Sequence, residues 1–178
     1  MIILDTETTG LLKPSSVSYN RQPKIIEAGI IKATKKGKII EEYSQLINPE
    51  EEITKEIYHI TGIKNKELNK APIFLEVWEN IANLFLGEKD IVGHNVLFDV
   101  EILHYALKRI DKDKFFPYCM NRICTVEKTY HIKNRRLKLD ELYFMATGQK
   151  PKNHHRALDD ARSTLDIYKW LRKKDIIK

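Results

Sequence analysis

Two acidic residues near the start of the chain, Asp5 and Glu7, have the type and spacing needed to bind a metal ion. They end a short apolar segment and are followed by Gly10. Side chains two positions apart in a strand point to the same face, so the two carboxylates are expected to face one way. The two carboxylates repel each other, and a divalent cation bound between them offsets this repulsion, because hard cations prefer carboxylate oxygens as ligands. The alternative is an ordinary strand end whose polar side chains face water.

Two further acidic positions, Asp99 and Asp160, lie far along the chain. Asp99 falls in the first turn of a predicted helix, where it serves either as a metal ligand or as an acid that interacts favourably with the helix dipole. Asp160 lies at the edge of the apolar stripe of the last predicted helix, and Asp159 lies nearly opposite that stripe. We therefore expect Asp160 to face a partly buried site and Asp159 to face solvent.

A histidine, His155, precedes Asp160 by five residues, which is not a same-face spacing on a helix. If both residues serve one site, His155 must lie on the loop that leads into the helix. Histidine has a pKa near neutral pH, so a His beside a cluster of carboxylates suits the role of a general base.

The elements that must position these residues follow a mixed α/β pattern. Strands are expected at residues 2–6, 25–33 and 38–47, and the turn-prone Lys35-Lys-Gly37 predicts a hairpin between the second and third. One further short strand is expected at 90–93. An antiparallel set followed by strand–helix alternation predicts a mixed sheet with helices on its faces. Helices are expected at 54–59, 74–86, 97–110, 137–147 and 157–173.

Length and composition predict a single folded domain over residues 1–178. Hydrophobic residues make up 42% of the chain and charged residues 31%, which is typical of a globular protein and excludes a disordered one. A chain of 178 residues is long enough for one well-buried core. The net charge of +6 suits a polyanionic partner, although basic chains without such a partner are common.

The cysteines and the apolar segments exclude other classes of protein. Cys119 and Cys124 are the only cysteines, and even with His131 they leave a structural zinc site one ligand short. We expect buried thiols in a reducing compartment. The apolar start breaks at Asp5, too early for a signal peptide or a membrane span, so a cytoplasmic location is expected.

Three motifs follow one another along the chain: Asp5-x-Glu7, His94-Asn-x-x-Phe98-Asp99 and His155-x-x-x-x-Asp160. In this order they resemble the DEDDh class of 3′-to-5′ exonucleases, a branch of the ribonuclease-H-like superfamily. The resemblance extends from Ile2 to about Trp170 and is greatest to the epsilon-type proofreading exonucleases of bacterial DNA polymerase III and their stand-alone relatives. The related DEDDy branch has Tyr where this chain has Arg156. Two further segments, at 25–27 and 60–63, are similar to segments that recur in this class.

The resemblance implies a ribonuclease-H-like mixed sheet and a two-metal hydrolytic site. Asp5, Glu7, Asp99 and Asp160 would hold two Mg²⁺ or Mn²⁺ ions. His155 would deprotonate the attacking water, and Glu7 would also contact the terminal 3′-hydroxyl. The products would be nucleoside 5′-monophosphates. The substrate-binding residues implied are Thr6, Thr8, Thr9, Gly10, Leu11, His94, Asn95 and Phe98.

The substrate stays open between single-stranded DNA and RNA. Residues 60–63 follow the epsilon-like pattern, which favours DNA, whereas ribonuclease T and oligoribonuclease share the same three motifs and favour RNA. A DNA polymerase is a candidate partner, and no membrane partner is expected. A non-catalytic nucleic-acid-binding module is the alternative from another class, but it predicts a lost ligand or base, and all five catalytic positions are filled.

A basic run precedes the helix expected at 137–147. It either contacts the phosphate backbone of a nucleic acid or forms a solvated loop. Its members are Lys133, Arg135, Arg136 and Lys138.

Overall fold

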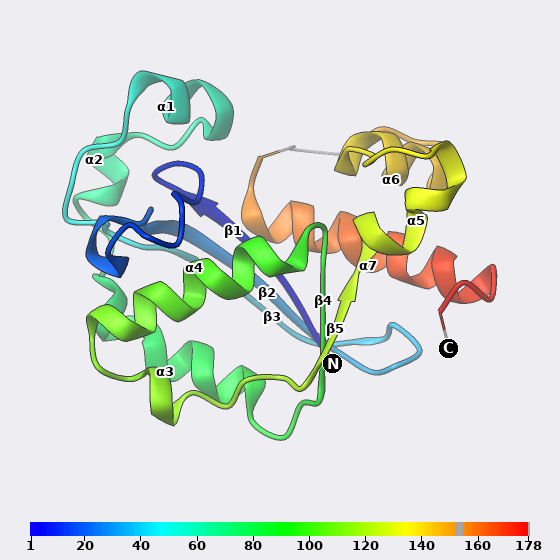
Figure 1. Ribbon diagram of the computed structural model, residues 1–178, viewed down its shortest axis with the longest axis horizontal. Helices are drawn as coiled ribbons and strands as arrows, with labels where there is room; N and C mark the ends of the chain where they lie inside the picture. Colours follow the sequence, from blue (N-terminus) through cyan, green and yellow to red (C-terminus); the bar gives the residue numbers. More distant parts are fainter. Residues whose placement is uncertain (152–154, 178) are drawn as a thin grey trace.

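A five-stranded mixed sheet forms the centre of the computed structural model, which describes residues 1–151 and 155–177 (Figure 1). The strand order is β3-β2-β1-β4-β5. β1 and β3 each pair antiparallel with β2, whereas β4 runs parallel to β1 and β5 parallel to β4. The predicted mixed fold is therefore confirmed. The strands are β1 (Ile2–Thr8), β2 (Ile25–Ala33), β3 (Ile39–Leu46), β4 (Asp90–Gly93) and β5 (Asn121–Cys124).

Helices cover both faces of the sheet (Figure 1). The alternation of side chains along β1 divides the core: Ile2 and Leu4 pack in one cluster with α3 and α4, and Ile3 packs in a second with α6 and α7. The helices described are α1 (Lys55–Thr61), α2 (Asn65–Leu68), α3 (Phe74–Phe85), α4 (Val96–Arg109), α5 (Thr125–Lys133), α6 (Leu139–Thr147) and α7 (Ala157–Lys173), with short 3₁₀ turns at Tyr19–Arg21 and Asp113–Phe115.

Three elements were missing from the sequence-based prediction: the strand β5, the helix α5 and the single-turn helix α2, which has only four residues. β5 has only four residues, and its first two, Asn121 and Arg122, are exposed at the sheet edge, so it lacks the apolar run of a central strand. α5 has three buried residues among nine and a weak apolar stripe. α6 also begins at Leu139, two residues later than expected.

The ends of two predicted helices are explained by local capping. Thr54 precedes α1, and its side-chain oxygen accepts a hydrogen bond from the backbone N–H of Ile57 (3.4 Å). Gly148 ends α6 in the left-handed conformation, as expected for a glycine at this position.

The described residues also bear on the other sequence-based expectations. Cys124 is buried, Cys119 is half-buried, and both are free thiols. In these parts of the chain, every helix is too short or too polar to cross a bilayer.

Candidate active site

Four carboxylates from three different elements lie at the carboxyl end of β1. Asp5 and Glu7 come from β1, Asp99 from the first turn of α4, and Asp160 from the first turn of α7. Asp99 and Asp160 are almost fully buried, at 3% and 4% exposure. Burial raises the pKa of Asp5 well above its ordinary value, and the charges of Asp99, Asp160 and Glu7 raise it further. The structure therefore brings together all four acids that the sequence singled out.

The other three acids show the same effect of burial on their pKa values. Burial, followed by the charges of Asp160 and Glu27, raises the pKa of Glu7 to about 8. Burial raises the pKa of Asp99 to about 7 and that of Asp160 to about 6. Carboxylates that repel one another in a poorly solvated site favour either protons or a cation. The cluster has the electrostatic character of a divalent-cation site.

Thr6 fixes the orientation of Asp99. Its backbone N–H and its hydroxyl both donate to Oδ1 of Asp99, at 2.9 and 2.8 Å. These hydrogen bonds lower the pKa of Asp99 and partly offset the effect of burial. They also join β1 directly to α4, so the acids from the two elements keep a fixed spacing.

The start of α7 is held against β2 by a buried acid that the sequence analysis did not assign to the site. Glu27 is 1% exposed, and its carboxylate accepts hydrogen bonds from the guanidinium of Arg156 (2.7 Å from Nη2) and from the backbone N–H of Ala157 (3.1 Å). Two residues along β2, Gly29 lies so close to Ala157 that an added Cβ would fall 2.2 Å from its carbonyl carbon. The available signal was a lone Glu within the apolar run of residues 25–31.

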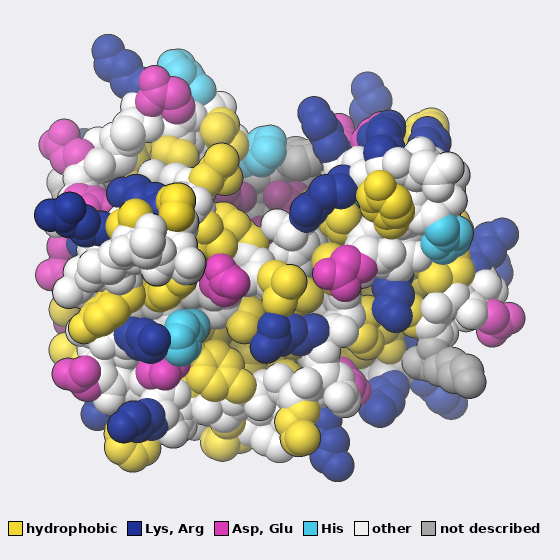
Figure 2. All heavy atoms as spheres, in the orientation of Figure 1, with side chains coloured by type: hydrophobic (Ala, Val, Ile, Leu, Met, Phe, Trp, Pro, Cys, Tyr) yellow, Lys and Arg dark blue, Asp and Glu magenta, His cyan; other side chains and the backbone are white. Residues whose placement is uncertain are grey.

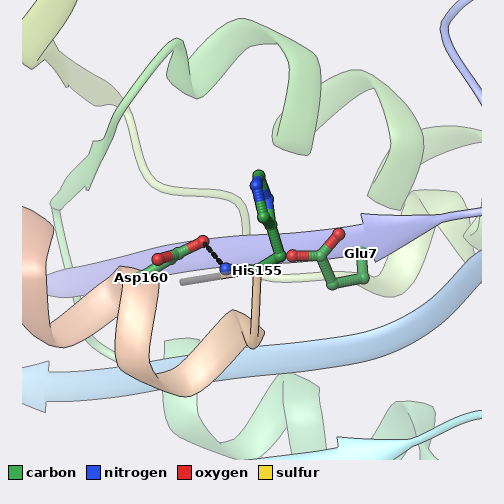
Figure 3. Close-up of side chains that lie close together, drawn as sticks. All are labelled: Glu7, His155 and Asp160. Atoms are coloured by element: carbon green, nitrogen blue, oxygen red, sulfur yellow. Dashed lines mark hydrogen bonds between the residues drawn. The ribbon is translucent and has the colours of Figure 1, made fainter. Parts of the chain in front are cut away.

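His155 lies on the loop immediately before α7, as its spacing from Asp160 required. Its φ of +69° is left-handed, and its backbone N–H donates to Oδ2 of Asp160 at 3.1 Å. Glu7, His155 and Asp160 each offer a ligand atom, and these atoms lie within 4.8 Å of one another (Figure 3). Asp159 instead pairs with Arg162 at 2.9 Å. The histidine and the acids thus form one cluster.

The family of the chain follows from a comparison with known proteins. An exonuclease family model, RNase_T, matches residues 2–168. The chain belongs to this exonuclease family. The assignment confirms the resemblance to DEDDh exonucleases of the ribonuclease-H-like superfamily.

Relatives and solved structures agree with the family assignment. The chain is 31% identical over 174 residues to a PolC-type DNA polymerase III of Clostridium perfringens, covering 97% of this chain and 11% of that protein. The chain thus spans about a tenth of the length of this relative. The nuclease domain of 3′hExo, a DEDDh family member bound to rAMP, has a TM-score of 0.77 at 16% identity and covers 97% of this chain and 91% of that one. Exonuclease X in complex with 5′ overhanging duplex DNA has a TM-score of 0.68 at 23% identity, covering 98% and 92%.

The loop that follows β1 in this exonuclease family member contains the first group of predicted substrate-binding residues. The hydroxyl of Thr8 donates to the carbonyl oxygen of Gly10 at 2.7 Å, and that of Thr9 accepts from the backbone N–H of Lys24 at 3.1 Å. The hydroxyl of Thr6 is bound to Asp99. These hydroxyls are therefore used within the protein and shape the loop, whereas the side chain of Leu11 is 83% exposed.

The turn between β4 and α4 contains the second group, and its members have different surroundings. The two ring nitrogens of His94 lie 2.8 Å from Oγ1 of Thr125 and 3.1 Å from the carbonyl oxygen of Leu137, so His94 connects this turn to α5 and to the loop before α6. The backbone of Asn95 has the left-handed conformation, with a φ of +73°. Phe98 is half-buried against the core. Asn95 and Phe98 are therefore better placed than His94 to contact a ligand directly.

Proposed function

We propose that this chain is a metal-dependent 3′-to-5′ exonuclease that hydrolyses phosphodiester bonds at the 3′ ends of single-stranded DNA and releases nucleoside 5′-monophosphates. The observation that carries the proposal is the convergence of Asp5, Glu7, Asp99 and Asp160 beside His155. Membership of the exonuclease family supports it. We also propose that residues 1–178 form a single exonuclease domain, since β1 and α7, from opposite ends of the chain, contact each other in the same fold.

The donor set fits divalent ions of the Mg²⁺ or Mn²⁺ type. Carboxylate oxygens are the ligands that such hard cations prefer, and four acids with raised pKa values gain most from neutralisation. Asp5, Glu7, Asp99 and Asp160 would hold two ions. When bound, two ions in such a site lower the pKa of a bound water and stabilise the leaving oxygen.

The position of His155 supports the role of general base. It lies on the loop before α7, beside Glu7 and Asp160 (Figure 3). As the base, its neutral imidazole accepts a proton from the attacking water, and the neighbouring carboxylates stabilise the imidazolium that forms. Asp160 also accepts the backbone N–H of His155, which fixes the histidine relative to the acids.

The residues around the cluster are the proposed contacts for the 3′ end of the nucleic-acid substrate. Glu7 and the backbone around Thr6–Thr9 would meet the terminal 3′-hydroxyl, and their position at the end of β1, next to the cluster, supports this role. Leu11, Asn95 and Phe98 border this end of β1 and would contact the terminal bases. Phe98 offers an aromatic face on which a base can stack.

End-labelled DNA tests the direction and the chemistry of the reaction. With Mg²⁺ or Mn²⁺, a 3′-labelled single strand should release labelled mononucleotide at once, and a 5′-labelled strand should give a ladder of shortening products. EDTA should abolish both. Mononucleotide released first from the 5′ label would overturn the proposal.

Adjacent aspartates on α7 provide a matched pair for the same assay. Asp160→Ala should abolish hydrolysis because it removes a carboxylate from the cluster. Asp159→Ala should leave hydrolysis close to wild type because Asp159 pairs with Arg162. Wild-type activity in Asp160→Ala would mean that the catalytic site lies elsewhere.

RNA is the second candidate substrate, because the 3′hExo nuclease domain, which shares this fold, was solved bound to rAMP. Turnover on DNA and RNA oligomers of matched sequence separates the two. If RNA is cleaved much faster, RNA and not single-stranded DNA is the substrate.

The PolC-type relative is itself a DNA polymerase III, so a DNA polymerase is the protein partner that we propose.

A further inference from the structure

Two neighbouring arginines in the loop between α5 and α6 have different partners. Arg135 forms a two-pronged ion pair with Glu141, with Nη1 and Nη2 at 2.9 and 2.5 Å from its carboxylate oxygens. Arg136 turns toward the start of α4, where Nη2 donates to Oδ1 of Asn95 at 2.6 Å. Among the residues described, Glu141 neutralises the charge of Arg135, whereas Arg136 has a neutral amide as its partner. Arg136 therefore retains a full positive charge at an exposed position.

The loop that carries Arg136 is fixed to the active-site end of the sheet. Leu137 directly follows Arg136 in the sequence, and its carbonyl oxygen lies 3.1 Å from Nε2 of His94. Asn95 then precedes Asp99 by four residues, which is about one turn of α4. Arg136 is thus bonded to a residue that lies about one helical turn before Asp99, a carboxylate of the cluster.

Figure 2 shows a hollow between the part of the molecule formed by α1 and the part formed by α5 and α6, with acidic side chains inside it. Lys and Arg side chains gather on the side formed by α5 and α6. A polyanionic strand that enters this hollow meets a repulsive acidic floor, so a positive charge on one side reduces the cost of binding.

We propose that Arg136 binds the backbone phosphate next to the one that is cleaved, and that Asn95 orients its guanidinium for this contact. The inference rests on the proposed exonuclease function and names a substrate contact within it. A guanidinium has five N–H donors in a planar fork that matches two phosphate oxygens. The bond to Asn95 uses one donor and leaves the other side of the fork for the phosphate. In this arrangement the scissile phosphate binds at the acidic cluster, and Arg136 reaches the next phosphate from the loop between α5 and α6.

Binding of single-stranded DNA as a function of salt measures this contact. Arg136→Gln should weaken binding of a labelled oligonucleotide about tenfold, and the slope of log K against log salt should fall by about 0.7, the loss of one phosphate contact on a single strand. Arg135→Gln should leave both unchanged because Arg135 is bound to Glu141. Arg136→Lys should restore most of the slope because it keeps the charge. Melting temperatures of all variants should match the wild type, since both arginines are exposed.

An oligonucleotide with one neutral linkage locates the phosphate. A methylphosphonate at the linkage next to the scissile one removes that charge. It should raise the KM of the wild type by the same factor as Arg136→Gln raises it on normal DNA, with kcat nearly unchanged. In Arg136→Gln the neutral linkage should cause no further change in KM, because the substitution and the neutral linkage remove the same interaction.

The outcomes separate this inference from the function on which it rests. Wild-type protein that degrades DNA while Arg136→Gln binds and cleaves like Arg135→Gln would overturn the inference alone. Equal effects of the neutral linkage in the wild type and in Arg136→Gln would also overturn it. Wild-type protein that neither binds nor degrades single strands would overturn the inference together with the proposed function.

Discussion

At the scale of single residues, the chemistry depends on side chains whose positions are fixed by hydrogen bonds. Thr6 holds Asp99 through two donors, and Asp160 accepts the backbone N–H of His155. The acids and the histidine could be singled out from the sequence, because their residue types suit metal and base chemistry and their order matches the motifs of the DEDDh class. The supporting role of Thr6 and the ion pair of Glu27 were not predictable. Thr6 lies 93 positions from Asp99 in the sequence, and Glu27 lies 129 positions from Arg156.

His155 is the residue on which the proposed base chemistry depends. His155→Ala should lower the rate of hydrolysis by about 10² or more, because a positioned general base contributes at least that factor. Single-turnover cleavage of a labelled strand measures it. His131→Ala, which removes an exposed histidine from α5, provides the control. An unchanged rate in His155→Ala would remove this residue from the mechanism.

Thr6 acts through Asp99, and its hydroxyl can be removed without a large change in volume. Thr6→Val deletes the 2.8 Å hydrogen bond and leaves the backbone N–H of residue 6 as the remaining donor to Asp99. We expect affinity for Mn²⁺ to fall about tenfold, as is typical for groups that support a metal ligand. Isothermal titration calorimetry with Mn²⁺ alone measures it. Thr147→Val removes an exposed hydroxyl on α6 that donates to the carbonyl oxygen of Tyr143, and this variant should bind Mn²⁺ like the wild type.

At the scale of elements, the site depends on how closely α7 packs on β2. Asp160 and His155 belong to the start of α7, and that start is fixed by Glu27 and Gly29. The long helices and the first three strands were predictable because their apolar patterns are strong. β5 and α5 were not, because an edge strand of four residues and a weakly apolar helix are specified mainly by their pairing and packing with β4 and α7.

A methyl group at Gly29 tests this close packing. In Gly29→Ala, Cβ would lie 2.2 Å from a backbone atom of Ala157, so the start of α7 must move. We expect a loss of about 1–3 kcal/mol in the free energy of unfolding, as in overpacked cores, together with a loss of activity. Urea denaturation measures the former. Gly10→Ala has open space for its Cβ and should leave stability nearly unchanged. Equal stability of the two variants would contradict the close contact.

At the scale of the whole molecule, a chain with a net charge of +6 contains a compact cluster of acids. The fold concentrates negative charge at one end of the sheet and leaves Lys and Arg on one side of the hollow beside it (Figure 2). The net charge suited a polyanionic partner, but composition did not reveal where the basic groups lie. The arrangement supports the proposal that the substrate is a nucleic acid, bound through its backbone phosphates.

The raised pKa values of the acids make stability depend on pH. The pKa values of Asp160, Asp99 and Glu7 are about 6, 7 and 8 in the folded protein, above their ordinary values. The folded state therefore binds more protons than the unfolded state, so without metal the stabilising contribution of the cluster is complete below about pH 4 and is lost as pH rises to about 8. Divalent ions compete with these protons, so the stabilisation by Mg²⁺ should increase over the same range.

Calorimetric melting in EDTA and in Mg²⁺, at several pH values from about 5 to about 8.5, measures this effect. The difference in Tm between the two conditions should grow as pH rises. Asp5→Asn removes one of the repelling charges, so without metal this variant should have a higher Tm than the wild type at high pH and a smaller response to Mg²⁺. A difference in Tm that is the same at every pH would show that the acids do not bind the ion.

The central claim is that four acids from β1, α4 and α7 together hold divalent ions. Anomalous diffraction from crystals soaked in Mn²⁺ tests it most directly, because the signal locates the ions without reference to activity. We predict two peaks, each in contact with carboxylates from the set Asp5, Glu7, Asp99 and Asp160. Crystals that show Mn²⁺ at other surfaces and no peak among these four residues would contradict the claim.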